Sequence, residues 1–321
     1  MTHALNLVGV VLALGTGMWL AFAVPGGPSV IRLDGSISSA ASTATEPASS
    51  STFGPPLRDA RGASVQPKTY RRIASATTIA DQVLLELVEP TRIVAFSARS
   101  ARDAPDAFRY RGHPVIARLE DLEQLIALRP DLVFVSNLAD PRRVARLRGA
   151  GLNVFDLGPM HGVRTLIENI EQIGRLTGVS ARAESLSRRF RERLGRVADH
   201  VEESERRRAL YVGVHGDRLY GGTAGTSYAD VLRFAGLRDV AAEAGFSGWP
   251  TFTAEQLLVL DPPWLVTQTG RETALCRHVG FSELKACQQG QVRGVEAALL
   301  SDPGLRILEA AEATHAAIYS P

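Results

Sequence analysis

Three side chains in the last quarter of the chain could bind a metal ion or form a covalent cross-link. Cys276 and Cys287 are the only cysteines, and His278 lies between them. A disulfide would close a short loop, whereas two thiolates and an imidazole would give an incomplete ligand set for a metal ion or haem iron. Two free buried thiols are the third possibility. Two cysteines exclude a scaffold of several disulfides and a four-thiolate zinc site.

Motifs of the common nucleotide-binding and hydrolytic enzymes are missing from the sequence. There is no Gly-x-Gly-x-x-Gly after a strand, no Gly-x-x-x-x-Gly-Lys and no Gly-x-Ser-x-Gly. The seven histidines form no local cluster, which argues against a dedicated zinc or manganese receptor. We therefore predict a binding protein with no catalytic residues, no intrinsic cofactor and no metal site of its own.

The composition is that of a globular protein. The chain has 321 residues, of which 45% are hydrophobic and 22% charged, and this leaves room for two modest domains. Such values exclude a coiled coil, a collagen-like chain and a wholly disordered one. The net charge of +2 is too small to indicate nucleic-acid binding, and we predict none.

The amino-terminal residues 1–24 predict a signal peptide or a membrane anchor. Ala4 to Val24 is uncharged and mostly apolar, and at ~1.5 Å per residue it can cross a hydrocarbon core of ~30 Å. It ends in Ala21-Phe22-Ala23, the small-x-small pattern of a cleavage site. With no cysteine nearby, we expect no lipoprotein. Both alternatives place the remaining chain outside the cytoplasm, where a Cys276–Cys287 disulfide is the expected pairing.

Composition and periodicity divide the rest of the chain into four segments. Residues 25–70 are rich in Ser, Ala and Pro without apolar periodicity, which predicts a disordered linker. Residues 71–179 and 208–321 each alternate apolar strands with helical patterns, as in parallel sheets covered by helices. Residues 180–207 contain no proline and one glycine, and predict a long helix between the two lobes. If uncleaved, residues 1–24 would keep the protein in contact with the membrane.

The expected elements follow from apolar runs and capping residues. Asp140-Pro141 predicts a helix start, Gly178 and Gly236 predict helix ends, and Thr253 opens a capping-box pattern. The predicted strands cover residues 72–75, 92–96, 132–135, 153–157, 209–214 and 264–267. The predicted helices cover residues 79–87, 122–128, 141–150, 163–176 and 226–235, with a last helix after Gly304.

A short internal repeat relates the two lobes. Glu123–Pro130 aligns without a gap to Glu255–Pro262, and five of the eight residues are identical. Each block precedes a predicted apolar strand. The repeat therefore predicts two lobes of related structure.

Three runs of the sequence resemble a known family. Leu122–Val133, Leu147–Leu157 and Ile167–Gly178 resemble the helix-linked (class III) periplasmic substrate-binding proteins, which serve ABC importers of ferric siderophores, haem and cobalamin. The resemblance covers the chain from about Arg71 onward. It implies two Rossmann-like α/β lobes joined by one long helix, with a ligand cleft between them. The implied ligand is an iron chelate, haem or cobalamin, and the implied partner is a permease dimer with its ATPase subunits.

The resemblance also assigns roles to single residues. Family members carry one glutamate on each lobe that docks onto permease arginines, and the matching positions are Glu123 and Glu255. Both glutamates also fit a purely local role, because carboxylates are favoured near helix N-termini. Trp249 matches a position where the family often carries an aromatic residue in the cleft.

Further cleft residues follow from the rule that ligands meet the loops beyond the carboxyl ends of parallel strands. That rule nominates Thr77, Arg99 and Asn137 in the first lobe, and His215 and Arg271 in the second. An arginine in the cleft would suit an anionic chelate or a haem propionate. A solvated surface role is the alternative for each arginine, since the chain has many.

Together these features predict a monomeric, extracytoplasmic substrate-binding component of an ABC importer. Two alternatives remain. One is a tethered sensor that binds ligand without transport. The other is an enzyme of the chelatase type, which also uses two such lobes, because a fold alone does not exclude catalysis.

Overall fold

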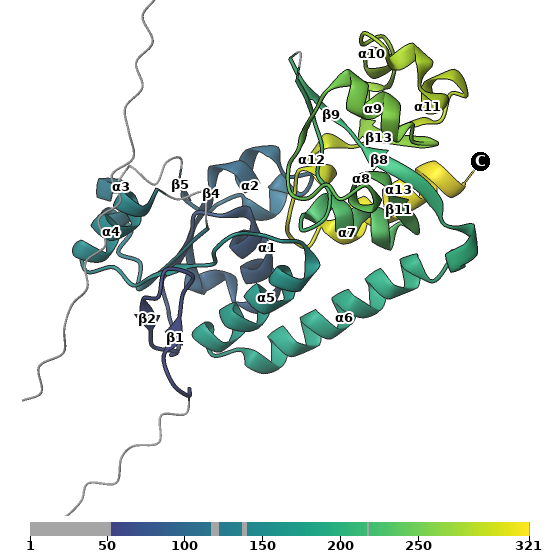
Figure 1. Cartoon of the computed structure of the whole chain (residues 1–321). Helices are drawn as coiled ribbons and strands as arrows, with labels where there is room; N and C mark the ends of the chain where they lie inside the picture. The colour runs from purple at the N-terminus through teal and green to yellow at the C-terminus, as the bar shows by residue number, and fades with distance from the viewer. Residues whose placement is uncertain (1–52, 117–121, 137–139, 217, 321) are drawn as a thin grey trace, which may run out of the picture. The chain divides into compact units, whose positions relative to one another are not determined.

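The computed structural model describes residues 53–116, 122–136, 140–216 and 218–320. These residues form two α/β lobes joined by the long helix α6 (Figure 1), as the sequence predicts. The predicted signal peptide or anchor and the larger part of the predicted linker lie outside the described residues. Within the described ranges, no helix combines the length and the hydrophobicity that crossing a membrane requires.

The folded sequence begins before Arg71, so the predicted linker extends too far. Strands β1 (Leu57–Arg58) and β2 (Ser64–Val65) pair as an antiparallel hairpin. Leu57, Val65 and Tyr70 are buried in the core of the first lobe. Three anchoring side chains spread over fourteen residues leave no apolar periodicity, which is why the sequence pattern did not predict this hairpin.

The first lobe is built on a parallel sheet of five strands in the order β5-β4-β3-β6-β7. The strands are β3 (Ile73–Ser75), β4 (Ile93–Ser97), β5 (Val115–Ile116), β6 (Leu132–Val135) and β7 (Val154–Asp156). The helices are α1 (Thr78–Leu87), α2 (Ala98–Asp103), α3 (Leu122–Ala127), α4 (Pro141–Gly149) and α5 (Val163–Thr177), with short 3-10 turns η1 (Pro90–Arg92) and η2 (Ala107–Tyr110). Asp140 caps α4 through its side chain, and Gly178 ends α5 in the left-handed conformation, as predicted.

The second lobe repeats this plan with a parallel sheet in the order β11-β8-β13-β14 and a small antiparallel sheet β12-β10-β9. The strands are β8 (Arg207–Tyr211), β9 (Gly213–His215), β10 (Arg218–Tyr220), β11 (Leu237–Asp239), β12 (Thr251–Phe252), β13 (Trp264–Gln268) and β14 (Val292–Val295). The helices are α7 (Ser227–Phe234), α8 (Val240–Glu243), α9 (Ala254–Leu260), α10 (Glu272–Cys276), α11 (Lys285–Gln288), α12 (Ala297–Leu300) and α13 (Ile307–Tyr319), with the 3-10 turns η3 (Glu203–Glu205) and η4 (Phe281–Glu283). The predicted strand over residues 209–214 is in fact two strands, because the chain leaves the parallel sheet after Tyr211.

The internal repeat corresponds to equivalent places in the two sheets. Helices α3 and α9 precede β6 and β13, each of which pairs with the first strand of its parallel sheet, β3 or β8. Arg129 and Asp261, aligned in the repeat, are the two non-glycine residues with positive φ in the described part of the chain, at 44° and 37°. The left-handed residue turns the chain from the helix into Pro130 or Pro262 and the strand beyond. The two lobes thus share their local construction.

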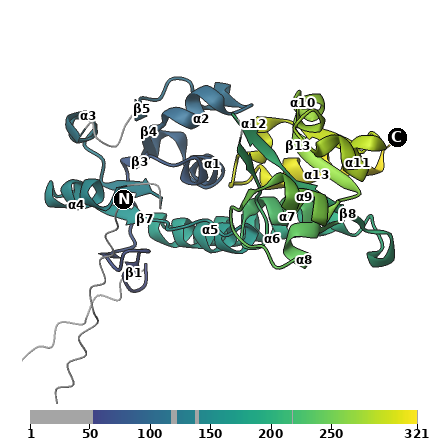
Figure 2. The ribbon, with the colours of Figure 1, turned by 45° about the horizontal axis from the view of Figure 1, so that its top comes forward.

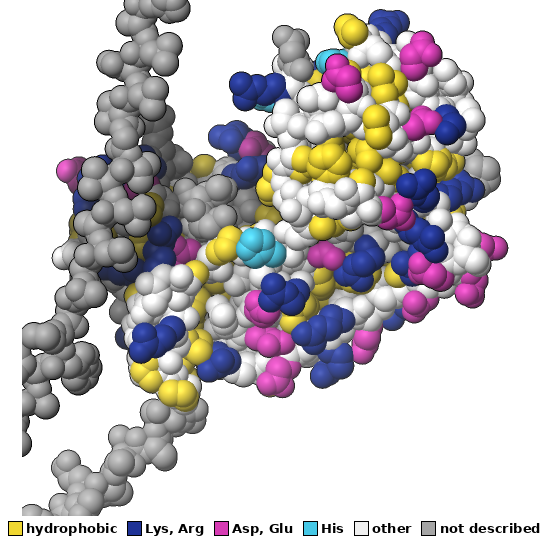
Figure 3. All heavy atoms as spheres, in the orientation of Figure 1, with side chains coloured by type: hydrophobic (Ala, Val, Ile, Leu, Met, Phe, Trp, Pro, Cys, Tyr) yellow, Lys and Arg dark blue, Asp and Glu magenta, His cyan; other side chains and the backbone are white. Residues whose placement is uncertain are grey.

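Helix α6 (Ser180–Ala198) connects the lobes and ends nine residues before the predicted limit at Arg207. Its stripe of Leu186, Phe190, Leu194 and Val197 is buried, as the sequence predicts, in one core that includes residues of both lobes. The helix lies along α5 and reaches α7 and α13 (Figure 2). Its outer face carries intermixed basic and acidic side chains (Figure 3).

The two cysteines form the predicted disulfide. Cys276 at the end of α10 is bonded to Cys287 in α11, with their Cα atoms 5.6 Å apart. This pairing removes both alternatives, a metal site that includes these thiolates and a pair of free thiols. In the part of the chain that the structure describes, no group of three or more His, Cys, Asp or Glu side chains is placed to hold a metal ion.

Candidate functional site

A cavity of about 430 Å³ lies between the lobes, within the size range of small-molecule sites. The first lobe contributes the loops that follow β3, β4, β6 and β7. The second lobe contributes the start of α7, the loop before β12 and the segment that precedes α13. The lining residues are Ala76, Thr77, Thr78, Ile79, Ser97, Arg99, Ser136, Met160, Ser227, Tyr228, Trp249, Ser301 and Pro303.

A second cavity of about 290 Å³ adjoins the first. Thr78, Arg99 and Ser301 line both cavities, and Gln268 at the end of β13 lines the second. Arg99 is the one cationic side chain among the described residues that line either of them. The two cavities therefore form one interlobe region, with Arg99 between its halves and the carboxylates of Asp103 and Asp302 lining the second.

Three of the predicted cleft residues line this region: Thr77, Arg99 and Trp249. Asn137 lies outside the described residues, directly after Ser136, which lines the cavity. His215 and Arg271 line neither cavity. His215 is carried away on the β9–β10 ribbon, because the parallel strand β8 already ends at Tyr211.

Three lining residues were not predicted from the sequence: Met160, Ser227 and Tyr228. Met160 follows the carboxyl end of β7, so the strand-end rule applied to that strand would have found it. Ser227 and Tyr228 open α7, whose N-cap Thr226 accepts a hydrogen bond from the Ala229 N–H at 3.4 Å. No periodicity signals that this particular helix start faces the other lobe.

Aromatic side chains form the wall of the cavity on the second lobe. Trp249 is 56% exposed and meets Tyr228 edge-on, with ring centroids 5.1 Å apart. Tyr228 in turn lies against Tyr211, with centroids 4.2 Å apart. Burial raises the pKa of both tyrosines, so their phenols are neutral at physiological pH. The wall thus presents an exposed indole that packs against buried, uncharged tyrosine rings.

A buried carboxyl group lies directly behind the cavity wall on the first lobe. Asp81 in α1 is fully buried and accepts hydrogen bonds from the hydroxyl and the N–H of Ser97, a lining residue. Burial raises the pKa of Asp81 to about 7, and hydrogen bonds from Ser75, Ser97 and Ser100 oppose the rise. The Asp81 carboxyl of the folded protein therefore titrates near neutral pH.

Replacing Asp81 by Asn should change how stability depends on pH. Between about pH 4 and pH 7 the unfolded chain releases the Asp81 proton while the folded protein retains it, so wild-type stability falls as pH rises, by up to about 4 kcal/mol. Asp81→Asn removes this contribution. Urea unfolding at several pH values from 4 to 8 should show that the free energy of unfolding of the variant increases relative to that of the wild type as pH rises. A constant difference between the two proteins would show that Asp81 does not titrate in this range.

The two glutamates assigned to docking lie at equivalent places on the two lobes. Glu123 in α3 and Glu255 in α9 are both exposed. The Glu255 backbone N–H and the Thr253 hydroxyl lower the pKa of Glu255, which keeps its charge negative. Exposed aliphatic side chains, Ile126 in α3 and Leu258 in α9, occupy aligned positions one turn further along each helix.

Comparisons with known proteins relate the chain to binding proteins. A model of the periplasmic binding protein family matches residues 73–299, well over half of the chain. A cobalamin-binding protein of Halobacterium salinarum is 32% identical over 150 residues, which are 46% of this chain and 40% of that protein. An uncharacterized ABC transporter substrate-binding lipoprotein of Bacillus subtilis is 25% identical over 206 residues, 62% of this chain and 65% of that one.

Solved structures have the same fold. A possible iron-binding periplasmic solute-binding protein of Staphylococcus epidermidis superposes with a TM-score of 0.70 at 19% identity, over 79% of this chain and all of that one. A periplasmic heme-binding protein of Pseudomonas aeruginosa gives 0.65 at 25% identity, over 78% and 93% of the two chains. The chain spans less than two thirds of the length of the curated relatives named above. The family match covers both lobes, and the chain belongs to the periplasmic binding protein family.

Proposed function

We propose that the protein is the extracytoplasmic substrate-binding component of an ABC importer and that its cargo is a corrinoid of the cobalamin class. The family match and the interlobe cavity support a binding role. Relatives named as cobalamin-binding proteins support the class of ligand. The amino-terminal segment then serves as an export signal or as a membrane tether.

The chemistry of the cavity carries the choice of ligand. No histidine or cysteine is among the described residues that line it. A corrinoid needs none, because its ring and its own axial groups already coordinate the cobalt. Its amide side chains need hydrogen-bond partners, and the cavity offers hydroxyls at Thr77, Thr78 and Ser227. Trp249 can stack on the ring, and Arg99 can pair with the ligand's phosphodiester.

Haem is the second candidate, and Tyr228 and Met160 are the side chains that favour it, since a phenolate or a thioether can bind haem iron. Two observations weigh against it. Burial raises the pKa of Tyr228, which disfavours the phenolate form. The Met160 sulfur already accepts hydrogen bonds from Asn169 at 3.4 Å and Thr165 at 3.5 Å within its own lobe.

Titrating the full chain with cyanocobalamin and, separately, with haemin tests the proposal. We expect one corrinoid per chain and weaker binding of haemin. Trp249→Ala should weaken cyanocobalamin binding roughly 10–100-fold, because Trp249 is the one exposed large hydrophobic side chain among the described residues that line the cavity. Phe108→Ala is the matched control, since Phe108 is 65% exposed and lines neither interlobe cavity. Equal loss of affinity in both variants would contradict the assignment of Trp249.

The same proposal assigns Glu123 and Glu255 to the contact with the permease. One charge on each of two similar lobes suits a partner made of two identical subunits, because each subunit then meets an equivalent surface. Near Glu255, Val259 is 85% exposed and Val279 is 83% exposed. These apolar side chains, with Ile126 and Leu258, give the docking surface a contact area beyond the two charges.

A further inference from the structure

Besides helix α6, hydrogen bonds between described residues join the lobes at two places, on different sides of the ligand cavity. The first is centred on Gln82 of α1, a buried side chain of the first lobe. Its amide oxygen accepts a hydrogen bond from the Leu305 N–H at 2.7 Å, and its amide nitrogen donates to the Asp302 carboxylate. Both partners belong to the second lobe. We name this contact the Gln82 latch.

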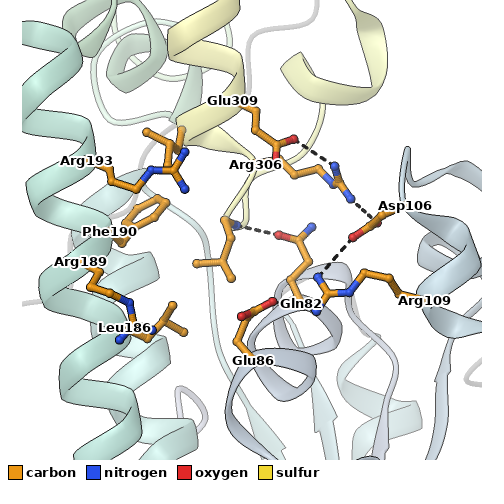
Figure 4. A pocket seen from close by; sticks show the side chains of 12 residues that line it. Gln82, Glu86, Asp106, Arg109, Leu186, Arg189, Phe190, Arg193, Arg306 and Glu309 are labelled. Atoms are coloured by element: carbon orange, nitrogen blue, oxygen red, sulfur yellow. Dashed lines mark hydrogen bonds and ion pairs between the residues drawn. The ribbon is translucent and has the colours of Figure 1, made fainter.

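An ion pair beside the Gln82 latch strengthens it. Arg306 of the second lobe is 7% exposed and pairs with Asp106 of the first lobe. Figure 4 shows this pair next to Gln82, at the edge of a pocket that α6 closes on its other side. Arg306 also contacts Glu309 at 3.1 Å within its own lobe. Separating the lobes would remove the Asp106 partner of this buried guanidinium and leave it only the carboxylates of its own lobe, Asp302 and Glu309, so the ion pair adds to the contact between the lobes.

The second contact lies at the start of α5. The N–H of Val163 donates to the Asp230 carboxylate of α7 at 2.6 Å, so a side chain of the second lobe caps a helix of the first. The N-cap residue Gly162 provides no side-chain cap of its own. We name this contact the Asp230 latch. Met160 and Tyr228, which line the ligand cavity, lie within three residues of its members.

Glycines make both latches possible. A Cβ on Gly304 would lie 2.5 Å from the Gln82 amide oxygen, and a Cβ on Gly162 would collide with the Asp230 carboxylate. Gly162 also has a φ of 91°, a conformation that side chains disfavour. At both places the backbone of one lobe approaches a polar side chain of the other too closely for any larger residue.

From this arrangement we propose that Gln82 and Asp230 are positioning residues, and that the two latches together set the spacing of the lobes and hence of the cavity walls. Each latch holds residues adjacent to the lining: Thr78 and Ile79 opposite Ser301 and Pro303 at one side, and Met160 opposite Tyr228 at the other. The lobes then act as one preformed body, and neither latch can open far without the other. Only the identity of the ligand that this spacing accommodates rests on the proposed function. The two latches are contacts within the protein and do not depend on which ligand binds.

Amide hydrogen exchange of the full chain without ligand tests this coupling, because Val163 and Leu305 each donate their N–H across the lobes. Gln82→Ala should speed exchange at Leu305 directly and, through lobe separation, at Val163 by about tenfold or more. Asp230→Ala should speed exchange at Val163 directly and, through lobe separation, at Leu305. Gly304→Ala should have the same effect as Gln82→Ala without removing a polar group. Amides of the interior strands β6 in the first lobe and β13 in the second should keep their protection in every variant, which shows that each lobe stays folded.

Two controls separate the latch role from general destabilisation. Asp230→Asn retains an oxygen for the Val163 N–H and should restore slow exchange at both sites. Gly195→Ala adds a methyl group to α6 in open space and should change neither amide. If each alanine variant speeds only its own partner amide, the latches are local and the proposal is wrong. Cyanocobalamin affinity is measured alongside, and its expected fall of about tenfold in either alanine variant tests the positioning of the walls. Failure of the wild type to bind this probe would count against the proposed cargo and leave the exchange result intact.

Discussion

Reversing both Glu123 and Glu255 to lysine should abolish uptake of cyanocobalamin in cells that carry the cognate permease. Each reversal places a positive charge against the basic surface that the glutamates are proposed to meet, and like-charge contacts of this kind cost several kcal/mol in a transient complex. Ligand affinity should not change, because neither residue lines the interlobe cavities. Single reversals should reduce uptake less than the double variant does, because each single variant keeps the glutamate contact of the other lobe.

The control for this experiment reverses two exposed glutamates elsewhere, Glu184 in α6 and Glu202 after it. That variant carries the same change in net charge and should retain uptake. If Glu123 and Glu255 act only as favourable charges near helix starts, the double reversal lowers the melting temperature slightly and uptake persists. A folded, ligand-binding double variant with full uptake would therefore rule out the docking assignment.

Removing the disulfide should cause the largest loss of stability among the substitutions considered. Cys276 and Cys287 are eleven residues apart, and cross-links of this span stabilise by ~2–3 kcal/mol through the entropy of the unfolded chain. For a folded region of this size, Cys276→Ser with Cys287→Ser should lower the melting temperature by roughly 5–10 °C. Thermal unfolding followed by circular dichroism measures the shift.

Ligand binding should survive removal of the disulfide below the melting temperature, because the loop that it closes lies outside both interlobe cavities. Adding reductant to the wild type should reproduce the shift, and adding it to the double serine variant should have no effect. A double variant as stable as the oxidised wild type would show that the cross-link contributes nothing to folding.

Signals confined to a few neighbouring residues predicted the helix limits well. The cap at Asp140-Pro141, the glycine after α5 and the capping box of Thr253 and Gln256 all occur where the sequence indicated. Each depends on hydrogen bonds within one turn, so local sequence is sufficient to specify it. The alternation of apolar runs likewise predicted the parallel sheets of both lobes.

Features that depend on distant contacts were predicted less well. No proline or glycine marks the end of α6 at Ala198, so the charged residues up to Arg207 appeared to continue the helix. The chain leaves the parallel sheet after Tyr211 to pair with β10, which only the tertiary structure shows. Tyr228 reaches the cavity because the lobes face each other there, and nothing near it in the sequence indicates that position. Trp249 and Arg99 both line the cavity; a family pattern had nominated Trp249, and its place after a strand end had nominated Arg99.

Hydrogen exchange with and without cyanocobalamin tests most directly whether the interlobe cavity is the binding site. We expect ligand to slow exchange in the segments that line the cavity, residues 76–79, 97–100, 226–229 and 301–304, and in the loop around Trp249. The segments around Glu123, Glu255 and Val279 should exchange as before. Protection confined to other regions, such as the pocket between α6 and Arg306, would show that the interlobe cavity is not the binding site, as would the absence of any protection at saturating ligand.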